Sequence, residues 1–334
     1  MILVEQSGGA CAIAGRFTTN QAVNLLTDFA ARGLHQRRTH ATSARCLRTI
    51  SCFVALTTMA LCISHAHAAP DGDATSSRAA RDEAIRAIPW RAIAPDDRRR
   101  AQEVIQNTSI YRRLPTRVID CDPAMFAFLI EHPEVVIDVW QLMGISRITL
   151  DKLPDGTYRG TDGAGTTGNV RYLHTSVTPD AQVLAVVYAD GAYDGKPFVT
   201  TLKAQSVLVL RSSAMQETNG RRYITVRVDS FVHVQQMGFE LIAKTVQPWL
   251  NKTADQNFIE TLSFISNFSR TAEKNPQGMQ RLSSRLPSID EPTRNELVQL
   301  CFRAADRYAQ RQNATRTSAN LLVHRPDVAV NRAW

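Results

Sequence analysis

The chain has 334 residues, 44% of them hydrophobic and 21% charged, with a formal net charge of +8. These values are those of an ordinary globular protein with one large or two small domains. Residues 1–68 hold six arginines and two acidic residues, so the rest of the chain has a net charge of only +4. This small, scattered excess argues against a nucleic-acid partner.

The first 68 residues have the pattern of a secretory signal peptide with an over-long N-terminal extension. Arg45 and Arg48 precede an apolar run over 49–63, and the small residues at 66–68 are those that a signal peptidase accepts. The run of about 15 residues is shorter than the roughly 20 that a membrane-spanning helix needs. We expect cleavage after Ala68, export to the periplasm or the outside of the cell, and no stable transmembrane span. A retained N-terminal membrane anchor is the alternative.

Residues 69–113 are predicted to form a flexible leader and a helical arm. The leader is rich in Asp, Gly, Ser and Ala. Helical patterns follow over 78–87 and 95–106, and the second begins with a proline and two aspartates, which suit the first turn of a helix.

The main domain is expected to span 114–286. A strand at 116–120 and helices over 124–131 and 134–143 come first, after which apolar and polar residues alternate as in strands with one buried face. The strand candidates are 146–153, 157–161, 169–175, 182–188, 202–211 and 222–234. Successive strands joined by short polar turns predict an α+β fold with one antiparallel sheet of six to seven strands.

The rest of the chain is predicted to be mostly helical. A helix over 238–250 follows the sheet, and a long amphipathic helix over 253–274 opens with a capping box at Thr253. At about 1.5 Å per residue this long helix spans roughly 33 Å, enough to cross a sheet. A shorter helix, a C-terminal helix within 287–312 and a disordered tail over 313–334 complete the chain.

The order of elements over 116–274 and the rhythm of the segment 121–140 resemble the START and polyketide-cyclase-like superfamily. The resemblance implies a helix-grip fold, in which a curved sheet wraps a long C-terminal helix and leaves an apolar cavity between them. The superfamily has no invariant motif, so the resemblance assigns no functional residue. The extra helix over 238–250 departs from the pattern, and a different α+β sheet, such as an NTF2-like cone, is the alternative.

The glycine-rich segment 163–170 has the spacing of a dinucleotide-binding fingerprint and of a kinase glycine loop. No helix opens after it, and the other kinase motifs are absent. We therefore expect a bend between strands. The histidines are not spaced as metal ligands, so neither a metal nor a cofactor is predicted.

The segment 188–195 carries two Asp-Gly pairs flanked by tyrosines. Asp190 or Asp194 at the mouth of a cavity would suit a general acid or base. Asp-Gly is also common turn chemistry, and a turn is the simpler prediction. In the last strand, Arg227 and Asp229 share a face and are predicted to be a surface pair.

Two cysteines, Cys121 and Cys301, remain after removal of the signal segment. An oxidising compartment permits a disulfide between them. Two separate buried thiols are the alternative, because Cys301 lies on an apolar helix stripe.

These expectations lead to a first hypothesis and two alternatives. The first is an exported, non-catalytic protein that binds a small apolar molecule, such as a lipid, between the sheet and the long helix. The residues expected to face this ligand are Trp140, Tyr188, Leu208, Leu210, Ile224, Val226, Val228, Phe258, Leu262 and Ile265. The alternatives are an enzyme on the same scaffold that uses Asp190 and Asp194, and a cell-envelope module that binds a protein partner through its terminal helices.

Overall fold

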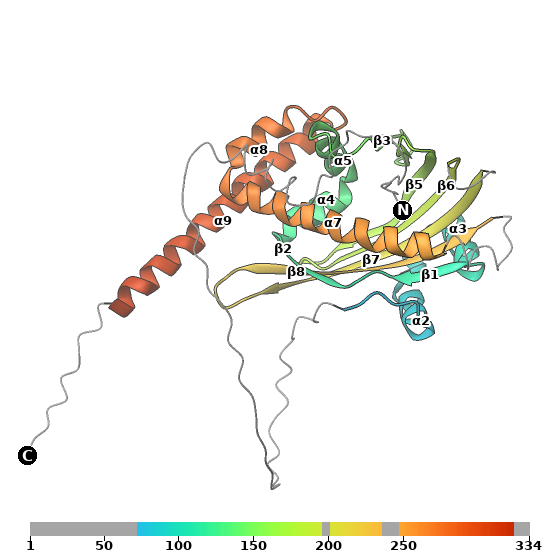
Figure 1. The fold of residues 1–334 in the computed structure, drawn as a ribbon. Helices are drawn as coiled ribbons and strands as arrows, with labels where there is room; N and C mark the ends of the chain where they lie inside the picture. Colours follow the sequence, from blue (N-terminus) through green and yellow to red (C-terminus); the bar gives the residue numbers. More distant parts are fainter. Residues whose placement is uncertain (1–71, 196–200, 236–246, 324–334) are drawn as a thin grey trace, which may run out of the picture.

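The computed structural model describes residues 72–195, 201–235 and 247–323, and in it one antiparallel sheet lies between two layers of helices (Figure 1). The strands are β1 (Ile110–Arg113), β2 (Arg117–Asp120), β3 (Thr149–Lys152), β4 (Tyr158–Thr161), β5 (Thr166–Val177), β6 (Val183–Tyr193), β7 (Leu202–Gln216) and β8 (Arg222–Val234). The helices are α2 (Arg78–Ala87), α3 (Pro95–Gln106), α4 (Pro123–Glu131), α5 (Pro133–Leu142), α7 (Gln247–Lys274), α8 (Pro276–Ser283) and α9 (Glu291–Val323), with a 3-10 turn at Trp90–Ala92.

The eight strands of the described sheet are ordered β1-β8-β7-β6-β5-β4-β3, and β2 also pairs with β8. Strands β3 to β8 are neighbours both in the chain and in the sheet, which confirms the predicted antiparallel meander and the α+β class. Strand β1 was not predicted. Its four residues are too few to display an alternating pattern, and it forms because it pairs with β8.

Asp190 and Gly191 lie within β6, not in the turn that their sequence predicts. Both residues pair with β5 on one side and with β7 on the other. A β-carbon on Gly191 would lie 2.7 Å from the carbonyl oxygen of Thr167, closer than real β-carbons come. Glycine at this position therefore allows β5 and β6 to approach closely. Pairing with strands on both sides outweighs the preference of Asp-Gly for a turn.

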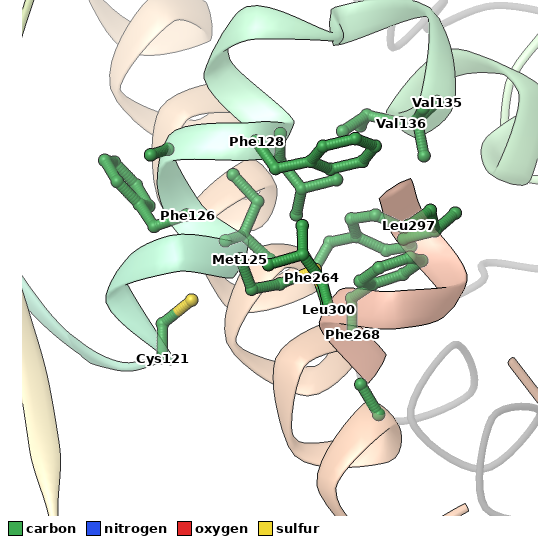
Figure 2. Packing of buried hydrophobic residues seen from close by; sticks show 14 of the residues in the cluster. Cys121, Met125, Phe126, Phe128, Val135, Val136, Phe264, Phe268, Leu297 and Leu300 are labelled. Carbon is green, nitrogen blue, oxygen red and sulfur yellow. The ribbon is translucent and has the colours of Figure 1, made fainter. Parts of the chain in front are cut away.

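One face of the sheet carries the larger helical layer, in which α7 lies over the strands (Figure 1). The core beneath it, which we call the α7-side core, brings together Phe128 of α4, Phe268 of α7 and Leu297 of α9 (Figure 2). Phe268 and Ile224 of β8 are fully buried. Burial of these large side chains is the main source of hydrophobic stabilisation on this face.

The two long helices depart from their predicted limits. Because α7 begins at Gln247, Thr253 lies inside the helix and is not its N-cap. Most of the helix predicted over 238–250 falls outside the described residues. Helix α9 continues to Val323, so the residues from 313 to 323 are helical, not disordered. Once its first half is packed, a helix can extend through polar sequence because each added residue contributes one hydrogen bond.

Helices α2 and α3 cover the opposite face and make the N-terminal arm part of the fold. Ala84 of α2 and Phe231 of β8 are both fully buried in a second apolar cluster. The predicted leader is held as well, since Gly72 forms a β-bridge with Thr116. From residue 72 onward, the arm is therefore a packed layer.

A buried group of charges joins this arm to the sheet. Asp229 has no exposed side-chain surface, and its Oδ1 accepts hydrogen bonds from the Tyr111 hydroxyl and from Arg113 Nε, both at 2.7 Å. Arg113 and Arg211 also donate to Glu83 of α2, at 2.8 and 3.0 Å. The surface pair predicted for Asp229 is therefore wrong: strand alternation turns this carboxylate toward the arm, which covers it.

Candidate apolar ligand site

A row of small residues crosses the sheet on the face that carries α7. Gly160 of β4 lies opposite Gly168 of β5, which lies opposite Gly191 of β6, and the row continues through Ala204 of β7 to Val234 of β8. Alternation along β7 places Ala204 on the side of the α7-side core. Three of these positions carry no side chain, so the backbone itself forms a bare floor.

Two of the glycines cannot be replaced without moving the strands. A β-carbon on Gly168 would lie 2.5 Å from the carbonyl oxygen of Asp190, and one on Gly191 would lie 2.7 Å from that of Thr167. Backbone atoms cannot swing aside as the end of a flexible side chain can. The close approach of β5 and β6 therefore requires glycine at both positions.

This glycine row is the floor of an apolar cavity of about 140 Å³. The apolar side chains around it include Ile148, Leu150, Val170, Leu202 and Val232. An apolar cavity of about 150 Å³ is large enough for benzene, whereas sites for drug-sized ligands occupy roughly 300–1,000 Å³. The cavity therefore suits a compact apolar group.

One wall of the cavity is anchored to α5 through a buried carboxylate. Ile148 packs with Tyr158 of β4 against Ile137 of α5. The Tyr158 hydroxyl donates a hydrogen bond to Oε2 of Glu134 at 3.0 Å, and Nδ1 of His132 lies 3.2 Å from the other oxygen. These contacts hold α5 against the β3–β4 hairpin.

Glu134 and Tyr158, which share this hydrogen bond, shift each other's pKa. Burial alone would raise the pKa of Glu134, but hydrogen bonds from His132, from its own backbone N–H and from Tyr158 lower it overall. Burial and the neighbouring Glu134 carboxylate raise the pKa of Tyr158. At neutral pH the carboxylate is therefore ionised and the tyrosine keeps the proton that it donates.

Most of the residues predicted to face the ligand lie in the packed core. Those in the α7-side core or packed against it are Trp140, Leu210, Ile224, Val226, Phe258, Leu262 and Ile265. Leu208 and Val228 share the same sheet face, whereas Tyr188 lies on the opposite face with α2 and α3. None of the ten is among the described residues that line the cavity.

The structure does not bring Asp190 and Asp194 together. Asp190 lies on the face opposite the cavity, where its Oδ1 accepts a hydrogen bond from Asn169 Nδ2 at 3.0 Å beside a polar hollow that Tyr188 also lines. Asp194 is exposed just beyond β6, with its N–H bonded to the carbonyl oxygen of Gly165 at 2.9 Å. Four residues of extended chain separate two side chains by about 13 Å, too far for a carboxylate pair.

The glycine-rich segment divides into a bend and a strand. Gly163 and Gly165 have positive φ angles of 68° and 116°, which agrees with the predicted bend. Gly168 lies in β5 and in the cavity floor instead. An isolated glycine inside an alternating segment is the signal that could have identified this position, because such glycines mark close backbone approach.

Cys121 and Cys301 are free, buried thiols in the α7-side core. Burial raises the pKa of Cys301 to about 12 and also raises that of Cys121, so neither is a thiolate at neutral pH. This arrangement is the alternative of two separate buried thiols, and the mass of the non-reduced protein would check it.

No protein-family model matches the chain, and no curated protein sequence does either. Within the described ranges, no helix combines the length and the apolar character that crossing a bilayer requires.

Proposed function

We propose that the protein is a non-catalytic binder of a small apolar molecule, held in the cavity above the glycine row. The observation that carries this proposal is the floor itself, because Gly168 and Gly191 cannot accept a side chain. Protein interiors are otherwise packed about as densely as organic crystals. An apolar hollow that strand geometry keeps open favours an occupant.

The resemblance to the START and polyketide-cyclase-like superfamily supports this proposal in one respect. That fold implies an apolar space between a curved sheet and a long helix. In this chain α7 packs against the core near Ile224 and Val226, while the cavity lies over Ala204 and Val234 on the same face. We therefore propose a ligand site that is displaced along the strands, away from the centre of the helix.

The lining of the cavity favours binding without chemistry. Acid–base catalysis needs a titratable group within hydrogen-bond reach of the reacting atoms. Among the described lining residues the carboxylates are those of Asp162 and Asp190, and Asp190 faces away. The enzyme alternative therefore has less support than the binding function.

Export belongs to the same proposal. A small apolar ligand needs a carrier where it must cross an aqueous space, and the pattern of residues 1–68 predicts secretion. N-terminal sequencing of the protein from its native host checks this step, and we expect the mature chain to begin at Ala69. A protein that retains Met1 would contradict it.

The ligand itself is tested by extraction. The purified protein is extracted with organic solvent, and the extract is examined by mass spectrometry beside a mock purification. We expect one small apolar compound in an amount that approaches the amount of protein. A protein that yields no such compound and binds none when apolar compounds are added would contradict the proposed function.

The location of the site is tested by filling it. Ala204→Leu adds three carbon atoms to the cavity floor, and we expect it to lower the amount of extracted compound at least about tenfold. Ala124→Leu is the matched control, because Ala124 is an exposed residue of α4 that does not line the cavity. Equal amounts of compound from the two variants would place the ligand elsewhere.

A further inference from the structure

The charges around the cavity restrict what it can hold. Among the described lining residues, the acidic side chains are those of Asp162 and Asp190, and no Lys or Arg is present. Asp190 bonds to Asn169 on the other face. Oδ1 of Asp162 already accepts the N–H groups of Ala164 and Thr166, at 2.7 and 2.8 Å. These residues give an anionic ligand group no positive partner.

Two hydroxyl groups flank the bare glycine row. Ser206 of β7 lies opposite Ala189 and Val232, only 7% exposed, and its side chain makes no hydrogen bond within the described part of the chain. Thr166, at the start of β5, lies on the other side of the row, and its Oγ1 is buried with no partner in the described structure. Native proteins satisfy most buried hydroxyl groups, so both retain capacity for an additional partner.

From this lining we infer that the ligand is an uncharged molecule with a compact apolar part and a hydroxyl or carbonyl group that hydrogen-bonds to Ser206, with Thr166 as a second partner. The inference rests on the proposed function and names the chemical class of its ligand. Small alcohols, phenols, ketones and esters belong to this class. Free carboxylic acids, which are anions at neutral pH, do not.

The physical reason is the difference between burying a neutral polar group and burying a charge. A hydroxyl loses its water contacts in the cavity and regains a hydrogen bond from Ser206, so its transfer costs little. A carboxylate buried without a cation loses far more hydration than a hydroxyl donor returns. A pure hydrocarbon avoids this penalty but leaves the Ser206 hydroxyl unpaired.

The test compares two probes that differ only in the polar group. The purified protein is titrated with 1-hexanol and with hexanoate at pH 7, and the shifts of protein NMR signals from residues around the cavity are followed. We expect 1-hexanol to bind at least about tenfold more tightly, because an unpaired buried charge is disfavoured. Ser206→Ala should weaken 1-hexanol binding about three- to tenfold, the range for one hydrogen bond.

Matched variants separate the hydrogen bond from general damage. Ser213→Ala removes a hydroxyl from an exposed position of β7 on the opposite face of the sheet. Thr225→Val, on that same face of β8 and outside the cavity lining, is the control for Thr166→Val. We expect both controls to bind 1-hexanol like the unmodified protein, and Thr166→Val to bind it more weakly.

The outcomes distinguish the two proposals. If hexanoate binds as tightly as 1-hexanol, the ligand class is wrong while the apolar site stands. If the Ser206→Ala and Ser213→Ala variants bind 1-hexanol equally, Ser206 does not hydrogen-bond to the ligand. The ligand class is then wrong as well, while the apolar site stands. If neither probe shifts signals around the cavity saturably, the proposed function itself fails.

Discussion

The two ends of the α7-covered sheet face follow the same strand alternation but are filled differently. At the packed end, near the β7–β8 turn, Ile224 and Val226 meet α4 and α7 in a core with fully buried aromatic rings. At the hollow end, the equivalent inward positions are Gly168, Gly191 and Ala204, and a cavity remains. The volume of the inward side chains, and not the pairing of the strands, decides whether this sheet face is packed or leaves a cavity.

The largest expected effect comes from emptying the packed end. Phe268→Ala removes a fully buried ring, and we expect it to lower the free energy of unfolding by about 4 kcal/mol because a cavity is left behind. Val170→Ala at the hollow end is the comparison, and we expect a loss below about 1 kcal/mol because this side chain borders empty space. Urea denaturation measures both, and equal losses would remove the distinction between the ends.

The next largest effect comes from adding a side chain to the floor. We expect Gly168→Ala to cost about 3 kcal/mol of unfolding free energy, since its β-carbon would meet the carbonyl oxygen of Asp190 at 2.5 Å. Gly160→Ala meets its nearest atom at 3.1 Å, and we expect it to cost about 1 kcal/mol. If Gly168→Ala has a higher denaturation midpoint than Gly160→Ala, β5 and β6 can move apart to accept the added β-carbon.

A smaller effect distinguishes overpacking from filling. Ala272 of α7 is fully buried, and Ala272→Leu should cost about 2 kcal/mol because the packed end has no room. Ala204→Leu enters the cavity, and we expect its stability to stay within about 0.5 kcal/mol of the unmodified protein. Thermal unfolding in the absence of ligand makes the comparison, and a loss of several kcal/mol for Ala204→Leu would mean that the hollow end is already filled.

The smallest effect concerns the wall of the cavity and depends on pH. The folded protein lowers the pKa of Glu134 below its ordinary value of 4.5, so this carboxylate contributes stability above that pH. The contribution is lost as pH falls through the lowered pKa. We expect Glu134→Gln to be about 1 kcal/mol less stable at pH 7, and the difference to shrink below pH 4.5. A difference that is independent of pH would exclude Glu134 as its source.

The sequence predicted correctly those elements whose limits and faces depend on residues close together in the chain. Helices α2 and α3 begin and end where the sequence predicts them, because Pro95 and the neighbouring aspartates suit a first turn. The alternation of Ile224, Val226 and Val228 with polar residues predicted strand β8 and the residues on its buried face. The fold class followed from this order of elements.

The cavity could not be predicted in the same way because it depends on register. Gly160, Gly168 and Gly191 are spread over three strands, and only the pairing of β4, β5 and β6 places them in one row. The local sequence of Asp190 and Gly191 favours a turn. The strands β5 and β7 that pair with these two residues are distant in the chain, so the pairing cannot be recognised from the local sequence. Apolar character alone does not distinguish a packed core from a binding site. Leu262, for example, is expected from the sequence to face the ligand but lies in the α7-side core.

The charge group under the N-terminal arm has a consequence for how the chain folds. Arg113 and Arg211 both bond to Asp229, and Arg227 bonds to Glu83, which lies 144 residues away in the sequence. Until α2 brings Glu83 to them, Arg113 and Arg211 share the carboxylate of Asp229, and Arg227, which lies opposite Arg211 in the sheet, adds a third positive charge that repels them. Docking of the arm and completion of the sheet are therefore coupled steps, and contacts so distant in the chain form slowly.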